Sequence, residues 1–559
     1  MIPTPLLRLV VPTQSTFGFS PADYVLLGLA GVIAGVFALR LQILWAVNAL
    51  AKRPLVSMLV LAALPIALRL AMLGHHPVPV PRVADDFSYL LLGDTLAHFR
   101  LANPMHPMRR FFEAVFVLQE PSRSSIYPLG QGLALAFGQL LFRVPWAGVL
   151  MSDGLLAALT FWMLRAWTDA RWALLGGVLA AIEFGPLSPW VNTYWGGAVS
   201  GIAGCLVFGA LPRLKQTRRT RDAVLLGIGL GLQLLTRPFE FAILVLLVIL
   251  SFAPARSLLI AAAVLLPAAG LTLLQNKQVT GAWLTLPYQV SRCQYGVPAT
   301  FTFEPNPTPH RALTAEQQVD YDSQIAVHGP GTDTMAAWFS RLVTRVRFYR
   351  FFFLAPLYLV IPAFALTLRE YRFAWVLMAI ALFWIAGTFY PYFYPHYIAA
   401  AACLFLLVTV KSLEVVSRLR IKQRRVGTDV VALILILCHG HFGFWYGVEL
   451  AGDERLLNAL NAEAYPNVVN YGDPEGRIAV DRQLAHSPGR QLVFVHFSPR
   501  HGPEEWIQNR ADIDNSKVVW AIDRGSAENT ALTGYYPDRT AWLLEGDVHP
   551  PILRLYIAR

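Results

Sequence analysis

Val83-Ala84-Asp85-Asp86-Phe87-Ser88-Tyr89 directly follows an apolar run and opens a polar stretch that extends to Gly132. The stretch continues through Asn103-Pro104-Met105-His106-Pro107 and ends in Tyr127-Pro128-Leu129-Gly130-Gln131-Gly132. Because the surrounding chain is mostly apolar, polar groups gathered here indicate an active site at one membrane face. The alternative is an ordinary solvated loop between two spans, since such loops are polar in any membrane protein.

The composition of the whole chain is that of a polytopic α-helical membrane protein. Only 14% of the 559 residues are charged, and the mean hydropathy is +0.47, which argues against a soluble enzyme. The net charge of +11 does not indicate a nucleic-acid partner, because Lys and Arg lie mostly in short loops, as in the positive-inside pattern. We predict no removable signal peptide and no disulfide, since only Cys293 lies in a polar loop.

Apolar runs predict about twelve membrane spans with both chain ends outside. Tyr127–Phe142 is apolar but short, and we interpret it as a helix lying on the outer membrane surface. No inverted repeat of the transporter kind is visible. The predicted spans are Tyr24–Val47, Leu55–Leu73, Pro145–Arg165, Trp172–Leu187, Gly196–Leu211, Ala223–Leu235, Phe241–Phe252, Leu258–Leu274, Phe351–Leu368, Phe373–Phe389, Tyr397–Val410 and Val430–Tyr446.

The chain divides into three predicted parts. Residues 1–54 hold one extra span, residues 55–446 form the main transmembrane domain with outer loops 74–144 and 275–350, and residues 447–559 form an outer α/β domain. This tail of about 100 residues is large enough for its own core. Its predicted strands are Leu492–Phe497, Lys517–Ile522, Ala541–Leu544 and Leu553–Ile557, and its predicted helices are Arg455–Ala464 and a segment around Glu504–Asn509.

Asp85 and Asp86 are the leading catalytic candidates. A carboxylate just outside a span can deprotonate an acceptor hydroxyl, although either aspartate could instead be a helix cap. No metal is required by this chemistry, and a weak divalent cation at the pair is left open. No nucleotide-binding glycine motif, zinc-spaced cluster or Ser-His-Asp motif stands out.

Ionisable residues near the outer ends of the spans predict a cavity open to the outside, with structural ion pairs as the alternative. This set is Arg69, Asp153, Glu183, Arg237 and Glu240. Arg237, Arg123 and His396 are candidates to hold an anionic group such as a phosphate, or they only reach toward lipid headgroups. Aromatic residues such as Tyr194 and Trp195 could stack on a sugar ring or belong to the interfacial belt.

The motifs, in their order, resemble those of GT-C class membrane glycosyltransferases, in particular the branch of protein O-mannosyltransferases and the bacterial aminoarabinose transferase of lipid A. Asp85-Asp86-Phe87-Ser88-Tyr89 is similar to the Asp-Glu-x-x-Tyr motif of the first outer loop. Tyr127-Pro128-Leu129-Gly130 resembles the Pro-rich lead into a surface helix, and Pro145-Trp146-Ala147-Gly148 resembles the restart of the span. Thr236-Arg237-Pro238 and Pro395-His396-Tyr397 resemble two further family segments.

This resemblance implies sugar transfer from a polyprenyl-phosphate donor to a glycan, lipid or protein acceptor, at the outer face of a bacterial inner membrane. Asp85 would be the base, Arg237 would hold the donor phosphate, and direct attack would invert the anomeric centre. Two positions depart from the family pattern: Asp86 replaces Glu, and Ile126 stands where a Lys often precedes the Pro-rich segment. The candidate substrate contacts are Tyr89, His106, Arg123, Tyr127, Tyr194, Trp195, Arg237, Glu240, His396 and Tyr397.

Two other functions are compatible with the sequence. A transporter or flippase for a lipid-linked glycan would place ionisable residues along a path that reaches the inner face. A non-catalytic envelope scaffold would act through the outer α/β tail. The clustering of ionisable residues toward the outer face favours the glycosyltransferase over the transporter.

Overall fold

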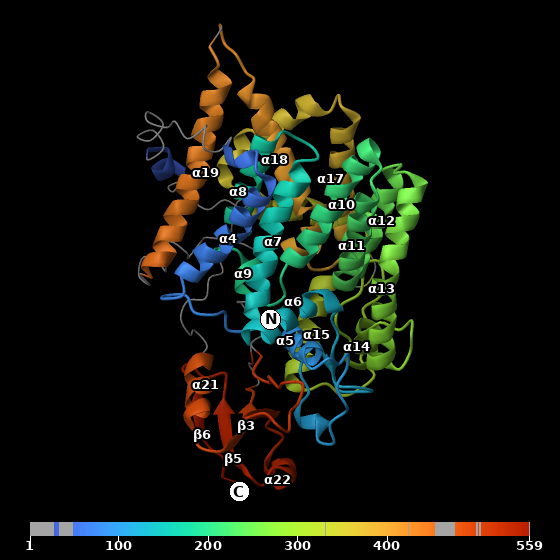
Figure 1. Ribbon diagram of the computed structural model, residues 1–559. Coiled ribbons are helices and arrows are strands. Elements are labelled where there is room, and N and C mark those ends of the chain that lie inside the picture. The colour runs from blue at the N-terminus through green and yellow to red at the C-terminus, as the bar shows by residue number, and fades with distance from the viewer. Residues whose placement is uncertain are drawn as a thin grey trace.

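A computed structural model describes residues 27–32, 49–329, 331, 333–422, 424–452, 476–498, 501 and 505–557. Most of the predicted first span, Tyr24–Val47, and the predicted helix Arg455–Ala464 lie outside these described residues. Within them, the structure is a bundle of apolar helices with a small sheet near the C-terminus (Figure 1).

Six helical segments in the described ranges are long and apolar enough to cross a membrane. The prediction of about twelve spans stays a prediction, because several apolar runs form shorter helices. The six are α4 (Pro54–Ala71), α7 (Trp146–Leu164), α10 (Ala198–Thr217), α13 (Ala255–Thr280), η5 with α18 (Pro395–Ala401 and Ala402–Ser417) and α19 (Val426–Ala451). The shorter helices are α8 (Ala170–Glu183), α11 (Thr220–Thr236), α12 (Pro238–Leu250) and α17 (Tyr371–Gly387).

The predicted span Phe351–Leu368 is not one α-helix. It forms parts of three 3-10 segments: η2 (Arg345–Phe352), η3 (Ala355–Leu359) and η4 (Ile361–Thr367). A proline stands in the first turn of both η3 and η4. Proline lacks the backbone N–H that a continuous α-helix would need at that position, so the helix restarts at each one.

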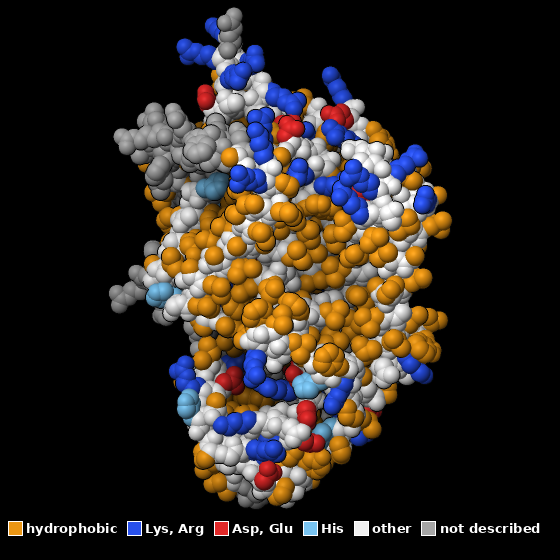
Figure 2. Space-filling model, viewed as in Figure 1, with side chains coloured by type: hydrophobic (Ala, Val, Ile, Leu, Met, Phe, Trp, Pro, Cys, Tyr) orange, Lys and Arg blue, Asp and Glu red, His pale blue; other side chains and the backbone are white. Residues whose placement is uncertain are grey.

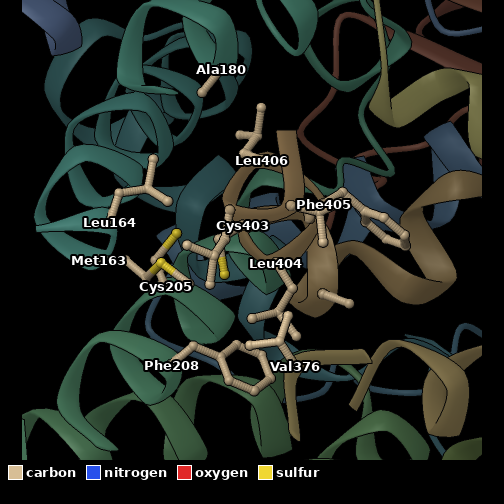
Figure 3. Packing of buried hydrophobic residues seen from close by; sticks show 14 of the residues in the cluster. Met163, Leu164, Ala180, Cys205, Phe208, Val376, Cys403, Leu404, Phe405 and Leu406 are labelled. Atoms are coloured by element: carbon tan, nitrogen blue, oxygen red, sulfur yellow. The ribbon is translucent and has the colours of Figure 1, made fainter. Parts of the chain in front are cut away.

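The centre of the bundle is a close-packed apolar core. Figure 3 shows side chains of α7, α10, α17 and α18 meeting there, among them Phe208, Val376 and Phe405. Cys205 and Cys403 belong to this core as buried free thiols. Close packing of this kind makes the bundle a rigid support for the loops at its ends.

On the face shown in Figure 2, a hydrophobic band crosses the bundle, and charged side chains are concentrated at its two ends. Many Lys and Arg side chains gather at the end farthest from the C-terminal strands. This arrangement is the one that the positive-inside pattern predicts for a chain whose C-terminal sheet lies outside.

The loop predicted to be the first outer loop, residues 74–144, supplies the elements of the candidate site, and the name is kept for it below. It contains α5 (Ala84–Ala97), η1 (Arg109–Phe111), the short strands β1 (Val117–Leu118) and β2 (Ser124–Ser125), and α6 (Leu129–Phe142). The second outer loop follows α13 and contains α14 (Pro287–Tyr295), α15 (Ala315–His328) and α16 (Met335–Thr344). The predicted surface helix is thus present as α6, and its position in the membrane surface stays a prediction.

The C-terminal part holds a four-stranded sheet in the order β4-β3-β5-β6. β3 (Arg490–His496) pairs in parallel with β4 (Val518–Ile522) and β5 (Arg539–Glu545), and β6 (Ile552–Leu555) pairs antiparallel with β5. All four predicted strands are confirmed. Helices α21 (Arg477–His486) and α22 (Ser526–Tyr535) complete this part.

The predicted helix around Glu504–Asn509 is wrong for its described residues, since 505–509 are not helical. Side-chain bonds to other elements hold this segment in an irregular conformation instead. The Asn509 amide donates to the Trp520 carbonyl at 2.6 Å and accepts from the Trp520 N–H at 3.0 Å. These bonds to β4 replace the local bonds that a helix would have made.

Candidate active site

Helix α5 carries the two adjacent aspartates in its first turn. The helix begins at Ala84 and its N-cap residue is Val83, so the interpretation of either aspartate as the N-cap is wrong. A helix N-terminus favours negative charge nearby, which suits both carboxylates at this position.

Asp86 holds two backbone segments in place. It is 4% exposed, and its two oxygens accept from the Tyr194 N–H at 2.9 Å and the Arg82 N–H at 3.2 Å. Burial raises the pKa of this carboxyl to about 6, although the two N–H donors oppose the shift. With both oxygens occupied by backbone donors, Asp86 fixes the start of α5 against the loop that contains Tyr194.

Asp85 points to a different set of partners. The Tyr127 hydroxyl donates a hydrogen bond to its carboxylate. The Tyr127 ring stacks on Tyr89 with ring centroids 4.1 Å apart and lies edge-on to Tyr288 at 5.8 Å. Burial raises the pKa of Asp85, while the Tyr127 hydrogen bond and the positive charge of Arg237 lower it. The result is an oriented carboxylate in an aromatic wall.

Arg237 lies at the junction of α11 and α12, where the chain turns at Pro238. Its Nε donates to Glu240 Oε1 at 3.0 Å, and its guanidinium lies 4.4 Å from the centroid of the Tyr397 ring. The charge of Arg237 lowers the pKa of the Asp85 carboxyl, and Tyr127, which bonds to Asp85, leads into the turn whose Gly130 packs against Thr236, the neighbour of Arg237. Glu240 is buried and balances part of this charge.

Gly130 explains how α6 approaches Arg237. A Cβ at this position would lie 2.1 Å from Thr236 Oγ1 and 3.0 Å from Thr236 Cα. Only glycine permits this approach, since real Cβ contacts of that length do not occur. The Tyr127-Pro128 turn is thereby brought next to the end of α11 that carries Arg237.

Aromatic side chains extend the site beyond Arg237. The Trp195 ring lies 5.1 Å from the His396 ring, and His396 lies 4.7 Å from Tyr397, centroid to centroid. Tyr394 packs against both Trp195 and His396. Tyr194 is part of the scaffold, because its hydroxyl donates to the Pro79 carbonyl at 2.8 Å and its carbonyl accepts from Gln131.

Two predicted substrate contacts lie elsewhere. His106 Nε2 is 3.1 Å from Asp514 Oδ1, and Arg123 donates to the carbonyls of Asn509 at 2.8 Å and Arg510 at 2.7 Å. Both side chains are buried against the C-terminal part, and burial lowers the pKa of Arg123 to about 10. The loop therefore uses these two side chains to hold the C-terminal part in place.

Several residues near Asp85 carry no motif in the sequence. Gln275 donates to the Tyr127 carbonyl at 2.9 Å, and Tyr288 packs against Tyr127. Burial raises the pKa of Asp320 on α15 to about 7, and the charge of Asp85 adds to this shift. Gln275 lies near the end of α13, and Tyr288 and Asp320 lie in the second outer loop. All three are distant in sequence from the first outer loop, so only the folded structure brings the two regions together.

The described residues contain no group of three His, Cys, Asp or Glu side chains placed to hold a metal ion. Asp85 and Asp86 point to separate partners, Tyr127 on one side and backbone N–H groups on the other. A weak cation at this pair stays an untested expectation.

The surface is hollowed between the hydrophobic band and the C-terminal sheet, and charged side chains rim the hollow (Figure 2). A separate cavity of about 150 Å³ lies among Trp167, Lys215, Ser251 and Trp375. It is at the opposite, basic end of the bundle and contains none of the predicted site residues. The chemistry described here therefore belongs to the other end of the bundle, beside the C-terminal sheet.

No family model matches the chain, and no curated protein matches it. Among solved structures, the oligosaccharyltransferase of Archaeoglobus fulgidus in the apo form is 14% identical with a TM-score of 0.43, over 79% of this chain and 62% of that chain. This chain thus spans less than two thirds of that enzyme. ArnT from Cupriavidus metallidurans is 10% identical in the apo state and 11% identical when bound to undecaprenyl phosphate. Both ArnT structures give a TM-score of 0.47, over 87% of this chain and 92% of theirs. At this level of similarity, function is argued from the site itself.

Proposed function

We propose that this chain is an integral-membrane glycosyltransferase that moves a sugar from a polyprenyl-phosphate donor to an acceptor hydroxyl. The observation that carries the proposal is geometric: Asp85 is bonded to Tyr127, and the turn that follows Tyr127 packs through Gly130 against Thr236, next to Arg237. Tyr89 stacks on Tyr127 and Tyr397 lies under the Arg237 guanidinium, so aromatic rings line both groups. A base and a cation are the two groups that such a transfer needs, because the phosphate leaves without help from a protein nucleophile.

In this mechanism Asp85 takes the proton of the acceptor hydroxyl. The acceptor oxygen forms a bond to the anomeric carbon as the bond from that carbon to the phosphate oxygen breaks, and polyprenyl phosphate leaves. Burial raises the pKa of Asp85, which brings the base closer to the acidity range in which general-base catalysis is efficient. A single displacement of this kind inverts the anomeric centre.

Arg237 would hold the leaving phosphate, since a guanidinium can donate two parallel hydrogen bonds to it. Its Nε is committed to Glu240, so the terminal Nη groups would make this contact. The clustered rings of Trp195, His396 and Tyr397, which are tilted or edge-on to one another, offer faces on which a sugar ring could pack. Asp86 would support the base by fixing the first turn of α5.

The reaction class can be tested by mass spectrometry on detergent-purified protein. Wild type is incubated with a panel of polyprenyl-phosphate sugars and an extract of envelope glycans, lipids and proteins. We expect one donor to be consumed, free polyprenyl phosphate to appear, and an acceptor to gain the mass of one sugar. Movement of a lipid-linked glycan across vesicles without a new glycosidic bond would overturn the proposal in favour of transport.

A further inference from the structure

The C-terminal sheet shares its hydrophobic core with the first outer loop. Successive residues of β3 point to opposite faces of the sheet. Val493 and Val495 pack with Leu91 and Val117 of the loop. Leu492 and Phe494 on the other face pack with Phe111 and Phe112. The loop that carries Asp85 therefore contributes to both faces of the sheet.

One segment of the C-terminal part contacts α5 at both of its ends. We call this segment, Glu505–Ala511, the strap. The Glu505 N–H donates to the Arg82 carbonyl at 3.2 Å, just before α5 begins. The Ala511 N–H donates to Asp94 Oδ2 at 2.7 Å, near the other end of α5. The strap thus runs along the helix that carries the proposed base.

Two arginines fix the strap in place. Arg123 donates to the carbonyls of Asn509 and Arg510, and its own backbone pairs with Asn103 of the loop. The guanidinium of Arg477 lies 4.3 Å from the Trp506 ring and 4.8 Å from the Phe87 ring. Arg477 is 3% exposed and stacks on Phe87, the residue that follows Asp86. Stacking and charge-assisted bonds in a buried place are strong and directional.

We propose that the strap is a positioning element that holds α5 in the register required for Asp85 to meet Tyr127. An α-helix has 3.6 residues per turn, so each residue is rotated by about 100° from the one before it. A shift of α5 by one residue would therefore turn the Asp85 side chain away from the Tyr127 hydroxyl. The inference rests on the proposed function for the importance of Asp85, but the contacts exist independently of it. Arg123 and Asp94 are the positioning residues, and they act through α5 without touching substrate.

The test measures α5 and Asp85 directly, without any substrate. Hydrogen exchange of the α5 amides is followed in detergent for wild type and Arg123→Gln. The protein is labelled with ¹³C-aspartate, and the titration of Asp85 is followed through its carboxyl band in the infrared spectrum. The band that disappears in Asp85→Asn is assigned to Asp85. Removing the three bonds that Arg123 makes to the strap should speed α5 exchange roughly tenfold. It should also move the Asp85 titration to higher pH, because the Tyr127 hydrogen bond that lowers its pKa is lost.

A second pair of variants keeps the test decisive if Arg123→Gln fails to fold. Asp94→Ala removes a single acceptor of the strap, whereas Asp94→Asn keeps an oxygen there. We expect Asp94→Ala to shift both readouts in the same direction and Asp94→Asn to restore them. Unchanged α5 exchange and unchanged Asp85 titration in Asp94→Ala would overturn the proposal. If no donor is ever consumed but these shifts occur, the positioning role stands and the proposed function falls.

Discussion

At the level of single residues, the environment of Asp85 is what distinguishes this site from an ordinary polar loop. Its carboxylate has an aromatic wall on one side, a hydroxyl donor in Tyr127 and the charge of Arg237 nearby. Asp86 is adjacent in sequence, yet its carboxylate accepts a hydrogen bond from the backbone N–H of Tyr194 in the neighbouring loop. Adjacent side chains on a helix diverge by about 100°, which explains the different roles.

Tyr127→Phe should shift the acidic limb of the pH–rate profile to higher pH. The Tyr127 hydroxyl stabilises the ionised form of Asp85, so its removal raises the pKa of that carboxyl further. A base must be ionised to work, and activity would then be lost at a higher pH as the solution is acidified. The limb is measured as kcat/KM against pH. An unmoved limb would mean that another group sets the profile.

Arg237→Gln should weaken both stability and catalysis. Glu240 would be left buried without its partner, which costs about 3–5 kcal/mol. Loss of the cation at the leaving phosphate should lower kcat/KM roughly 100-fold. The double variant Arg237→Gln with Glu240→Gln separates the two effects. It should recover the melting temperature and leave transfer impaired, and recovery of transfer as well would contradict the assigned role.

Short sequence motifs predicted Asp85, Tyr127 and Arg237 as site residues; the structure joins Asp85 to Tyr127 by a hydrogen bond, and the functional roles of all three stay predictions. His106 and Arg123 are equally polar and lie in the same stretch, yet they contact the C-terminal part. Sequence alone cannot tell a residue that contacts substrate from one that holds the C-terminal part. The partners of Arg123 are backbone carbonyls that lie 386 and 387 residues further along the chain. Gln275, Tyr288 and Asp320 carry no local pattern that would have indicated their position.

At the level of elements, the contact between α6 and α11 depends on Gly130. Gly130→Ala would place a methyl 3.0 Å from Thr236 Cα, and overpacking of this kind costs typically about 1–3 kcal/mol. We expect a lower melting temperature in detergent. Gly443→Ala in α19 is the matched control, because a Cβ there meets nothing within 4 Å. Equal melting temperatures for the two variants would show that α6 can move away without cost.

Elements marked by a clear hydrophobic pattern were predictable from the sequence. Elements whose conformation depends on residues distant in sequence were not. The strands β3, β4, β5 and β6 follow short apolar runs, and their predicted positions are confirmed. Residues 505–509 have a helical pattern, but they are not helical, because Asn509 and Arg123 bind them to other elements. The run Phe351–Leu368 is apolar enough for a span, and its prolines divide it into 3-10 turns.

At the level of the whole molecule, the outer loops and the C-terminal part meet through acidic side chains. Glu316 on α15 and Glu505 in the strap are both buried, 6% and 1% exposed. Burial, and then the charge of Glu505, raise the pKa of Glu316 well above the usual range of a glutamic acid. A raised pKa means that folding favours the protonated form, so its contribution to stability is lost as the pH rises through the folded-state pKa.

We therefore expect wild type to lose stability as the pH rises above the ordinary glutamic acid range. Glu316→Gln should lose less over the same range, because the amide cannot ionise. Thermal unfolding across pH measures the difference. Asp322→Asn is the control, since Asp322 lies on the same helix in an exposed position. Parallel curves for wild type and Glu316→Gln would exclude a role for this carboxyl pair.

The general architecture was predictable from hydropathy, and the way its parts join was not. The apolar runs and basic loops indicate a helical bundle with one basic end, as the structure shows (Figure 2). The tail was predicted to carry a core of its own. The structure shows that residues of the first outer loop enter that core on both faces of the sheet. Such packing depends on shape complementarity between distant segments, which leaves no periodic signal in either one.

The central claim is that Asp85 is the base for sugar transfer. The most direct measurement compares the rate of donor turnover by wild type and Asp85→Asn, in protein shown by its melting temperature to be folded. We expect a loss of roughly 100-fold or more in kcat for Asp85→Asn, with donor binding retained because Arg237 is intact. Turnover at the wild-type rate in folded Asp85→Asn protein would contradict it.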